Sequence, residues 1–136
     1  MGKTVLAAAA LLVITQLPAV AQDDEQFYQG IKYACTGIGL DAREDPRWGL
    51  YPLKLEFAAA GGDYLANVSV AIADSTGAPV FQARCEYAPW LLVDLPAGSY
   101  KVTATAPNGQ SKTVSLTVAK GKQRSLAFRF ESDEQT

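Results

Sequence analysis

The sequence predicts an all-β protein, a seven-stranded antiparallel β-sandwich that follows a cleaved signal peptide. Three observations indicate this fold class. Short runs alternate between apolar and polar residues, as strands with one buried face do. Turn-forming residues separate these runs at intervals of about 8–12 residues. No long amphipathic helical pattern interrupts them, so two sheets packed around one core are expected.

The N-terminal residues 1–21 have the layout of a secretory signal peptide. A basic start with Lys3 precedes an apolar run, and an A-x-A cleavage site ends at Ala21. The run is shorter than the roughly 18–20 residues of a membrane-spanning helix, and Gln16 and Pro18 end it. An uncleaved anchor is the alternative. We therefore expect a periplasmic or extracellular mature chain without a membrane span.

Two segments precede the expected sandwich. Residues 22–30 are polar and acidic and lack periodicity, so we interpret them as a flexible leader. Residues 31–52 form an N-terminal extension. Within it, Asp41 and Glu44 have the spacing of a capping box for a short helix, and Pro46 favours a new start.

The sandwich itself is expected between residues 53 and 130, and residues 131–136 form an acidic tail that we expect to be disordered. Each expected strand carries an apolar residue at every second position. The seven strands cover residues 53–57, 67–73, 79–85, 90–95, 100–105, 113–118 and 124–130.

The turns between these strands have recognisable chemistry. Asp74 to Gly77 and Pro107-Asn108-Gly109 are typical of tight turns, because Asp, Asn and Gly tolerate the backbone conformations that turns need. Pro96-Ala97-Gly98 lies between two apolar runs and predicts a hairpin, since Pro cannot donate to a sheet ladder and Gly adopts positive φ.

The two cysteines of the chain are Cys35 and Cys85. In an oxidising compartment an even cysteine count favours a disulfide. Such a bond would tie the N-terminal extension to the sandwich. Two buried free thiols are the alternative.

Composition excludes several function classes. The chain has 12 basic and 14 acidic residues, and no basic stripe supports nucleic-acid binding. It has no histidine, which removes the commonest general base and the commonest zinc ligand. Paired cysteines would leave no thiol nucleophile. We therefore expect no catalytic residues and no cofactor, with an enzyme that uses carboxylates alone as the alternative.

The densest carboxylate cluster comprises Asp41, Glu44 and Asp45. Oxygen ligands of this kind suit Ca²⁺, but the cluster lacks the spacing of a calcium-binding loop. We interpret it as a solvated charged segment that pairs in part with Arg43 and Arg47, and expect no metal.

Aromatic residues provide the candidate contact site. Trp48 lies among charged residues and, with Arg43 and Arg47, is the candidate for contact with a partner. Trp90 lies in an apolar run and is expected in the core. A stacking surface for a sugar or peptide would draw on Trp48, Tyr51, Tyr64, Tyr87 and Trp90.

Several of these segments together resemble a carboxypeptidase regulatory-like domain. The resemblance rests on Asn67-Val68-Ser69-Val70 to Asp74, the turn that ends at Gly77, Trp90-Leu91-Leu92, and Leu95-Pro96-Ala97-Gly98-Ser99-Tyr100-Lys101-Val102. It covers about residues 53–130 and implies the transthyretin-like (prealbumin-like) seven-stranded sandwich. It also implies a non-catalytic accessory module of secreted proteins. Hydrolases of this fold rely on histidines, which this chain lacks.

The sequence thus predicts a secreted or periplasmic interaction module without catalysis. We expect its partner to be a protein or envelope component, bound through an exposed sheet edge. The alternative is a small-ligand or carbohydrate-binding protein that uses exposed aromatics near Trp48. The segment from Cys35 to Trp48 lies outside the family resemblance, which leaves its role open.

Overall fold

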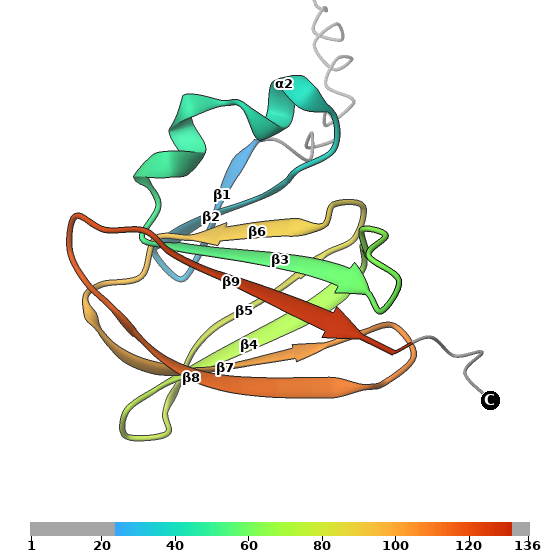
Figure 1. Cartoon of the computed structure of the whole chain (residues 1–136). Coiled ribbons are helices and arrows are strands. Elements are labelled where there is room, and N and C mark those ends of the chain that lie inside the picture. The colour runs from blue at the N-terminus through green and yellow to red at the C-terminus, as the bar shows by residue number, and fades with distance from the viewer. Residues whose placement is uncertain (1–23, 132–136) are drawn as a thin grey trace, which may run out of the picture.

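The computed structural model describes residues 24–131, and these form two β-sheets packed face to face as a sandwich (Figure 1). The five-stranded sheet has the order β1-β2-β6-β3-β9, and the four-stranded sheet has the order β5-β4-β7-β8. The elements are β1 (Glu25–Tyr28), β2 (Ile31–Thr36), α2 (Leu40–Arg43), η1 (Pro46–Leu50), β3 (Leu53–Ala59), β4 (Val68–Asp74), β5 (Pro79–Cys85), β6 (Trp90–Val93), β7 (Gly98–Thr105), β8 (Ser111–Val118) and β9 (Arg124–Phe130). The predicted signal peptide and residues 132–136 of the tail lie outside the described residues.

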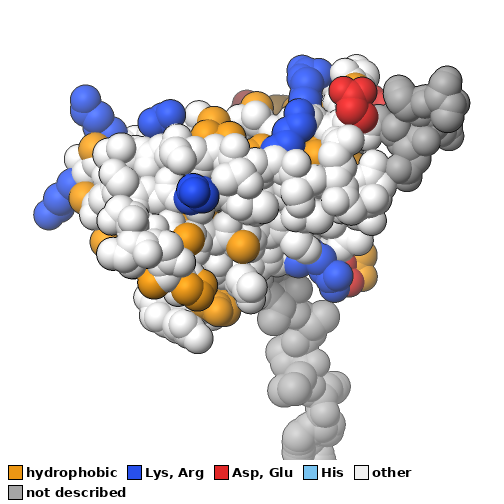
Figure 2. All heavy atoms as spheres, turned by 90° about the horizontal axis from the view of Figure 1, so that it is seen from below, with side chains coloured by type: hydrophobic (Ala, Val, Ile, Leu, Met, Phe, Trp, Pro, Cys, Tyr) orange, Lys and Arg blue, Asp and Glu red, His pale blue; other side chains and the backbone are white. Residues whose placement is uncertain are grey.

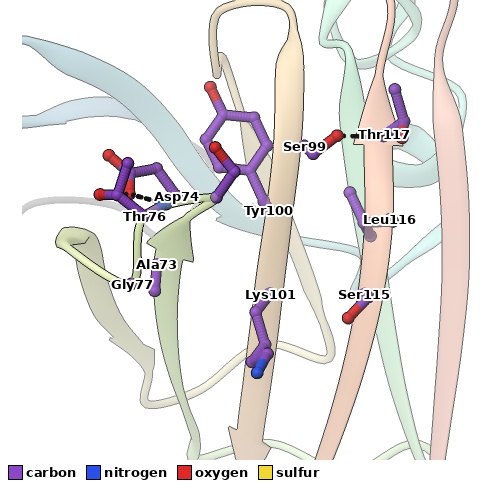
Figure 3. Close-up of a pocket in the computed structure, with 11 residues that line it drawn as sticks. Ala73, Asp74, Thr76, Gly77, Ser99, Tyr100, Lys101, Ser115, Leu116 and Thr117 are labelled. Atoms are coloured by element: carbon purple, nitrogen blue, oxygen red, sulfur yellow. Dashed lines mark hydrogen bonds between the residues drawn. The ribbon is translucent and has the colours of Figure 1, made fainter.

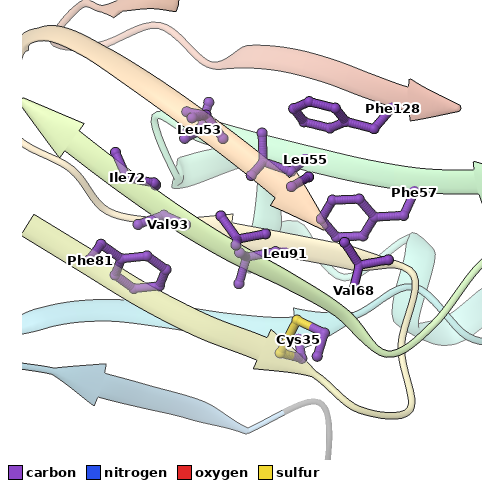
Figure 4. Packing of buried hydrophobic residues seen from close by; sticks show 14 of the residues in the cluster. Cys35, Leu53, Leu55, Phe57, Val68, Ile72, Phe81, Leu91, Val93 and Phe128 are labelled. Atoms are coloured by element: carbon purple, nitrogen blue, oxygen red, sulfur yellow. A yellow bond between two sulfur atoms is a disulfide. The ribbon is translucent and has the colours of Figure 1, made fainter. Parts of the chain in front are cut away.

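The main core lies between the two sheets and follows the predicted alternation. On β3, Leu53, Leu55 and Phe57 are fully buried, whereas Lys54 and Glu56 are half-buried on the outer face. Figure 4 shows these apolar side chains meeting those of the opposite sheet. Burial of each such side chain stabilises the fold by about 1.5–3 kcal/mol. The predicted β-sandwich is confirmed.

The N-terminal part adds a hairpin that was not expected. β1 and β2 pair antiparallel through a two-residue turn at Gln29 and Gly30, which have φ of 47° and 87°. Positive φ at both positions is the geometry of a type I′ hairpin. The prediction of a flexible leader over residues 22–30 is therefore wrong for residues 25–28, and the described chain has nine strands rather than seven.

One strand pair also departs from the antiparallel prediction. β9 runs parallel to β3, in register from Leu53 opposite Arg124 to Ala59 opposite Phe130. Residues 119–123 carry the chain from the four-stranded sheet across to the five-stranded sheet. β9 therefore pairs with a strand far earlier in the chain, which no local pattern reveals.

The connection at Pro96-Ala97-Gly98 is a crossover between sheets. It leads from β6 in the five-stranded sheet to β7 in the four-stranded sheet, so the predicted hairpin is wrong. The Tyr100 hydroxyl donates a hydrogen bond to the Pro96 carbonyl at 2.7 Å, which fixes this corner. By contrast, the turns predicted around Gly77 and Asn108 do join β4 to β5 and β7 to β8.

The extension covers the outer face of the five-stranded sheet (Figure 1). There a second buried cluster forms under α2 and η1; its members are Ala34, Trp48, Tyr51, Trp90 and Leu92. β6 is consequently buried on both faces, with Leu91 and Val93 in the main core. The extension is thus a structural cover for this sheet.

Of the two short helices of the extension, the first begins differently from the prediction and the second begins where it was predicted. The residue that precedes α2 is Gly39, and no side chain caps this helix, so the predicted capping box of Asp41 and Glu44 is wrong. The second helix does start at Pro46, where Asp45 accepts a hydrogen bond from the Arg47 backbone N–H. None of the helices within residues 24–131 has the length and apolarity needed to cross a bilayer.

Candidate binding surfaces

Trp48, the predicted contact residue, is buried. Its side chain is 3 % exposed, and its indole N–H donates to the Ala42 carbonyl at 2.8 Å. The Arg47 guanidinium lies 4.5 Å from the centre of the Trp48 ring and covers it. Arg43 donates to the Gly37 carbonyl at 2.7 Å. Trp48 therefore fastens the extension to the sheet and presents no contact surface.

The wider aromatic stacking surface is not formed either. Tyr51 and Trp90 are buried in the same cluster as Trp48. Tyr64 and Tyr87 are exposed, but the Arg43 guanidinium lies 4.2 Å from the centre of the Tyr64 ring. Three of the five aromatic side chains are therefore buried within the protein, so the five do not line a shared sugar-binding face.

Of the three carboxylates in the predicted cluster, Asp45 is engaged locally, whereas Asp41 and Glu44 are exposed. Asp45 forms a salt bridge with Arg47 at 2.7 Å, and this contact lowers the pKa of Asp45 and raises that of Arg47. Within residues 24–131, no three His, Cys, Asp or Glu side chains are grouped so as to hold a metal ion. The geometry assigns Asp45 to the start of η1.

The predicted disulfide between Cys35 and Cys85 is confirmed. Both half-cystines are buried, so the bond belongs to the core. A structural disulfide fits a protein of an oxidising compartment, such as the periplasm or the extracellular space.

The most distinctive surface is the outer face of the four-stranded sheet. We name it the hydroxyl face, because Ser and Thr occupy most of its positions. Its residues are Ser69, Ala71, Ala73, Gln82, Arg84, Ser99, Lys101, Thr103, Thr105, Ser111, Thr113, Ser115 and Thr117.

Strand register arranges these side chains in rows across the sheet. One row runs from Ser111 through Thr105 and Ser69 to Arg84. Hydroxyls that face each other across β7 and β8 are hydrogen-bonded, at 2.9 Å between Thr103 and Thr113. The side chains are therefore held in a regular array, as cross-strand pairs of this type are.

The face is hollowed at both ends. One hollow, of about 680 Å³, lies between the β4–β5 turn and β7 and β8, and Lys101 lines it (Figure 3). A second, of about 520 Å³, lies over β4, β5 and β7, and Arg84 lines it. Figure 2 views the molecule from this side: single basic side chains and small hydrophobic patches stand among uncharged surface, and the acidic side chains in view lie toward the margin.

The acidic residue beside the first hollow is Asp74. Its Oδ1 accepts hydrogen bonds from the Thr76 N–H, the Thr76 hydroxyl and the Ala78 N–H. These bonds lower the pKa of Asp74 and keep the carboxylate ionised within its own turn. Burial raises the pKa of the nearby Tyr100 phenol. The Asp74 carboxylate beside this hollow is thus already hydrogen-bonded within its own turn.

A second candidate surface is the free edge of β8. Its partner on one side is β7, over the full register from Gly98–Val118 to Thr105–Ser111, and within residues 24–131 no strand pairs with its other side. The inward-facing Val114 is half-buried at this edge. The backbone groups on the open side of β8 are therefore available to another strand.

An exposed sheet edge was expected from the sequence, but β8 was not identified as that edge, and the hydroxyl face was not predicted. The signal for the hydroxyl face was present, because Ser and Thr alternate with apolar residues over residues 113–118. What the pattern could not show is that the same alternation on β7 lies directly beside it. A comparison with protein-family models and with curated proteins found no match for this chain.

Proposed function

We propose that this protein is a non-catalytic interaction module of the periplasm or extracellular space, which binds a partner protein by adding a strand to β8. A signal peptide over residues 1–21 would deliver it there. Membership of the carboxypeptidase regulatory-like domains is part of this proposal, and the two-sheet sandwich is in keeping with it.

The observation that carries the proposal is the contrast between β8 and the other edge strands. Edge strands are normally blunted by charge, proline, bulges or short length. β1 has four residues, and β9 carries Arg124 and Arg129. β5 begins with Pro79, and its pairing with β4 is interrupted by a register shift.

β8 lacks these protections over most of its length. Lys112 is the charged residue of this strand, and residues 113–118 contain no charge, no proline and no register shift. The lateral side of the sandwich between β8 and β9 also leaves Val114 and Leu126 half-buried. A strand with alternating apolar residues would pair with the β8 backbone and cover Val114.

Site-specific photo-crosslinking in the native secreted compartment tests this proposal. A photoreactive amino acid replaces Ser115 on β8 or Gln82 on β5, since both side chains are exposed on edge strands of the same sheet. The proposal requires a crosslink from position 115 that maps to an extended segment of one partner. Equal products from both positions, or none from position 115, would overturn it.

A matched pair of variants sharpens the test. Val114→Lys places a charge on the β8 edge, and Val80→Lys places one on the β5 edge, where Val80 is also half-buried. We expect Val114→Lys to abolish the crosslink and Val80→Lys to preserve it. Circular dichroism of both variants checks that the sandwich remains folded.

A further inference from the structure

We propose that the hydroxyl face binds an extended acidic polysaccharide, whose anionic groups pair with Lys101 and Arg84 and whose hydroxyls bond to the Ser and Thr array. This site is separate from the backbone edge of β8, so a negative result for one proposal does not contradict the other. Binding of a polymer and binding of a partner protein would occupy different surfaces of the same sheet.

The charged side chains on the hydroxyl face are both basic, and the one carboxylate that lines the first hollow, Asp74, is already held by hydrogen bonds within its own turn. The chain carries a formal net charge of −2, whereas the charged members of the hydroxyl face are Lys101 and Arg84. Within residues 24–131 Lys101 is in no salt bridge, and Arg84 has a long one, 3.9 Å, to exposed Glu86. Lys101 can therefore pair with an external anion, and Arg84 can exchange its long, exposed contact with Glu86 for one.

The hydroxyls are positioned before any ligand arrives. Thr103 and Thr113 share a hydrogen bond of 2.9 Å, and Thr105 and Ser111 share one of 2.7 Å. A hydroxyl has one donor and two acceptor sites, so each pair retains capacity for a ligand. Because these side chains are already ordered, binding loses less conformational entropy.

The dimensions of the face fit a chain of sugars better than a single sugar. Lys101 and Arg84 lie in different hollows, two strands and two rows apart. Their Cα atoms are therefore separated by roughly 16 Å, from strand spacing and rise. Both hollows open onto one surface, so an extended ligand can reach both cations.

Other anionic partners fit this face less well. A nucleic acid or an anionic bilayer surface is held by clusters of basic residues, and a bilayer also by inserted apolar or aromatic side chains. The apolar members of the hydroxyl face are Ala71 and Ala73, and the tyrosines that line the two hollows, Tyr100 and Tyr28, are half-buried. An array of hydroxyls with two separated cations instead matches a polymer that carries both hydroxyls and carboxylates.

Affinity gel electrophoresis of the folded protein tests the proposal, with polygalacturonate in the gel as the acidic probe and dextran as the neutral one. We expect retardation by polygalacturonate alone, and weaker retardation at high salt. Lys101→Gln and Arg84→Gln should each weaken the apparent affinity about fivefold, the loss of one exposed charged contact. Lys122→Gln and Arg124→Gln make the same charge changes away from the face and should retain binding.

A double variant separates the contribution of the hydroxyls to binding from that of the charges. Thr103→Val with Thr113→Val keeps the β-branched shape and net charge but removes one hydroxyl pair, and we expect weaker retardation. The proposal is overturned if polygalacturonate and dextran retard the protein equally or not at all, or if face and control variants behave alike. Binding to phosphatidylglycerol vesicles without binding to polygalacturonate would also overturn it.

Discussion

Cys35 on β2 is bonded to Cys85 on β5, and this disulfide joins the five-stranded sheet to the four-stranded sheet (Figure 4). The two residues are 50 positions apart in the sequence. In the unfolded chain the bond removes much of the freedom of this long loop. We therefore predict that Cys35→Ala with Cys85→Ala lowers the free energy of unfolding by about 2–4 kcal/mol.

Urea unfolding followed by tryptophan fluorescence measures this change. The reduced wild-type protein is the control, because reduction removes the bond without altering the side-chain volume. It should approach the stability of the double variant. Equal stability of oxidised wild type and double variant would show that other contacts hold the sheets together.

Trp48 is expected to act on stability because it is one of the two tryptophans in the buried cluster under α2 and η1. Trp48→Ala should lower the free energy of unfolding by about 3–5 kcal/mol, as removal of a buried aromatic does. Trp48→Phe keeps much of the packing but leaves the Ala42 carbonyl without its indole donor, a loss of about 1–3 kcal/mol. Chemical denaturation of both variants measures these effects. A Trp48→Ala protein as stable as the wild type would contradict this structural role.

Those parts of the fold that depend on local chemistry could be predicted from the sequence. Alternation located the core strands, such as residues 53–57, and Asn108-Gly109 located the β7–β8 hairpin. Those parts that depend on a distant segment could not be predicted. Pro96-Ala97-Gly98 marks a reversal of the chain, but the sheet that receives β7 is decided by pairing with β4.

The burial of Trp48 likewise depends on segments that are distant in the sequence. The charged neighbours of Trp48 in sequence predict exposure, whereas its ring packs against Ala34 and Leu92 from other segments. The run of buried residues in β6 held a clue, because a strand that is apolar on both faces needs a cover on each. The extension supplies that cover, and sequence alone does not identify which segment does so.

Tyr51 makes stability sensitive to alkaline pH. Burial, together with the hydrogen bond that its hydroxyl donates to the Glu25 carboxylate at 2.6 Å, raises the pKa of Tyr51 above its ordinary value. The unfolded chain therefore releases this proton first as the pH rises above about 10. The stabilisation is complete below that pH and is lost as the pH rises toward the folded-state pKa.

Urea unfolding at a series of alkaline pH values tests this linkage. The free energy of unfolding of the wild type should fall steeply above about pH 10. Tyr51→Phe should be less stable near neutrality, by about 1 kcal/mol for the lost hydrogen bond, but its alkaline decline should be shallower. Tyr87→Phe, at an exposed tyrosine, is the control and should decline as the wild type does. Parallel declines in all three proteins would contradict the assignment.

Gly37 and Gly39 form a natural matched pair, because only their surroundings differ. Their φ values are 104° and 91°, a region that residues with a side chain rarely adopt. A Cβ atom at Gly37 would lie 2.6 Å from Cγ of Trp90, whereas a Cβ at Gly39 would meet nothing within 4 Å. Gly39→Ala therefore isolates the backbone cost, about 1–2 kcal/mol.

Gly37→Ala adds displacement of the buried Trp90 ring, which also packs under the Lys54 ammonium at 3.7 Å from its centre. We expect the free energy of unfolding of this variant to be lower than that of Gly39→Ala by about 1–3 kcal/mol, the usual cost of overpacking. Thermal unfolding of both variants gives the comparison. The double variant Gly37→Ala with Trp90→Leu relieves the clash. Its loss of unfolding free energy should therefore be smaller than the sum of the losses in the two single variants. Strictly additive losses would mean that Trp90 does not set the need for glycine at position 37.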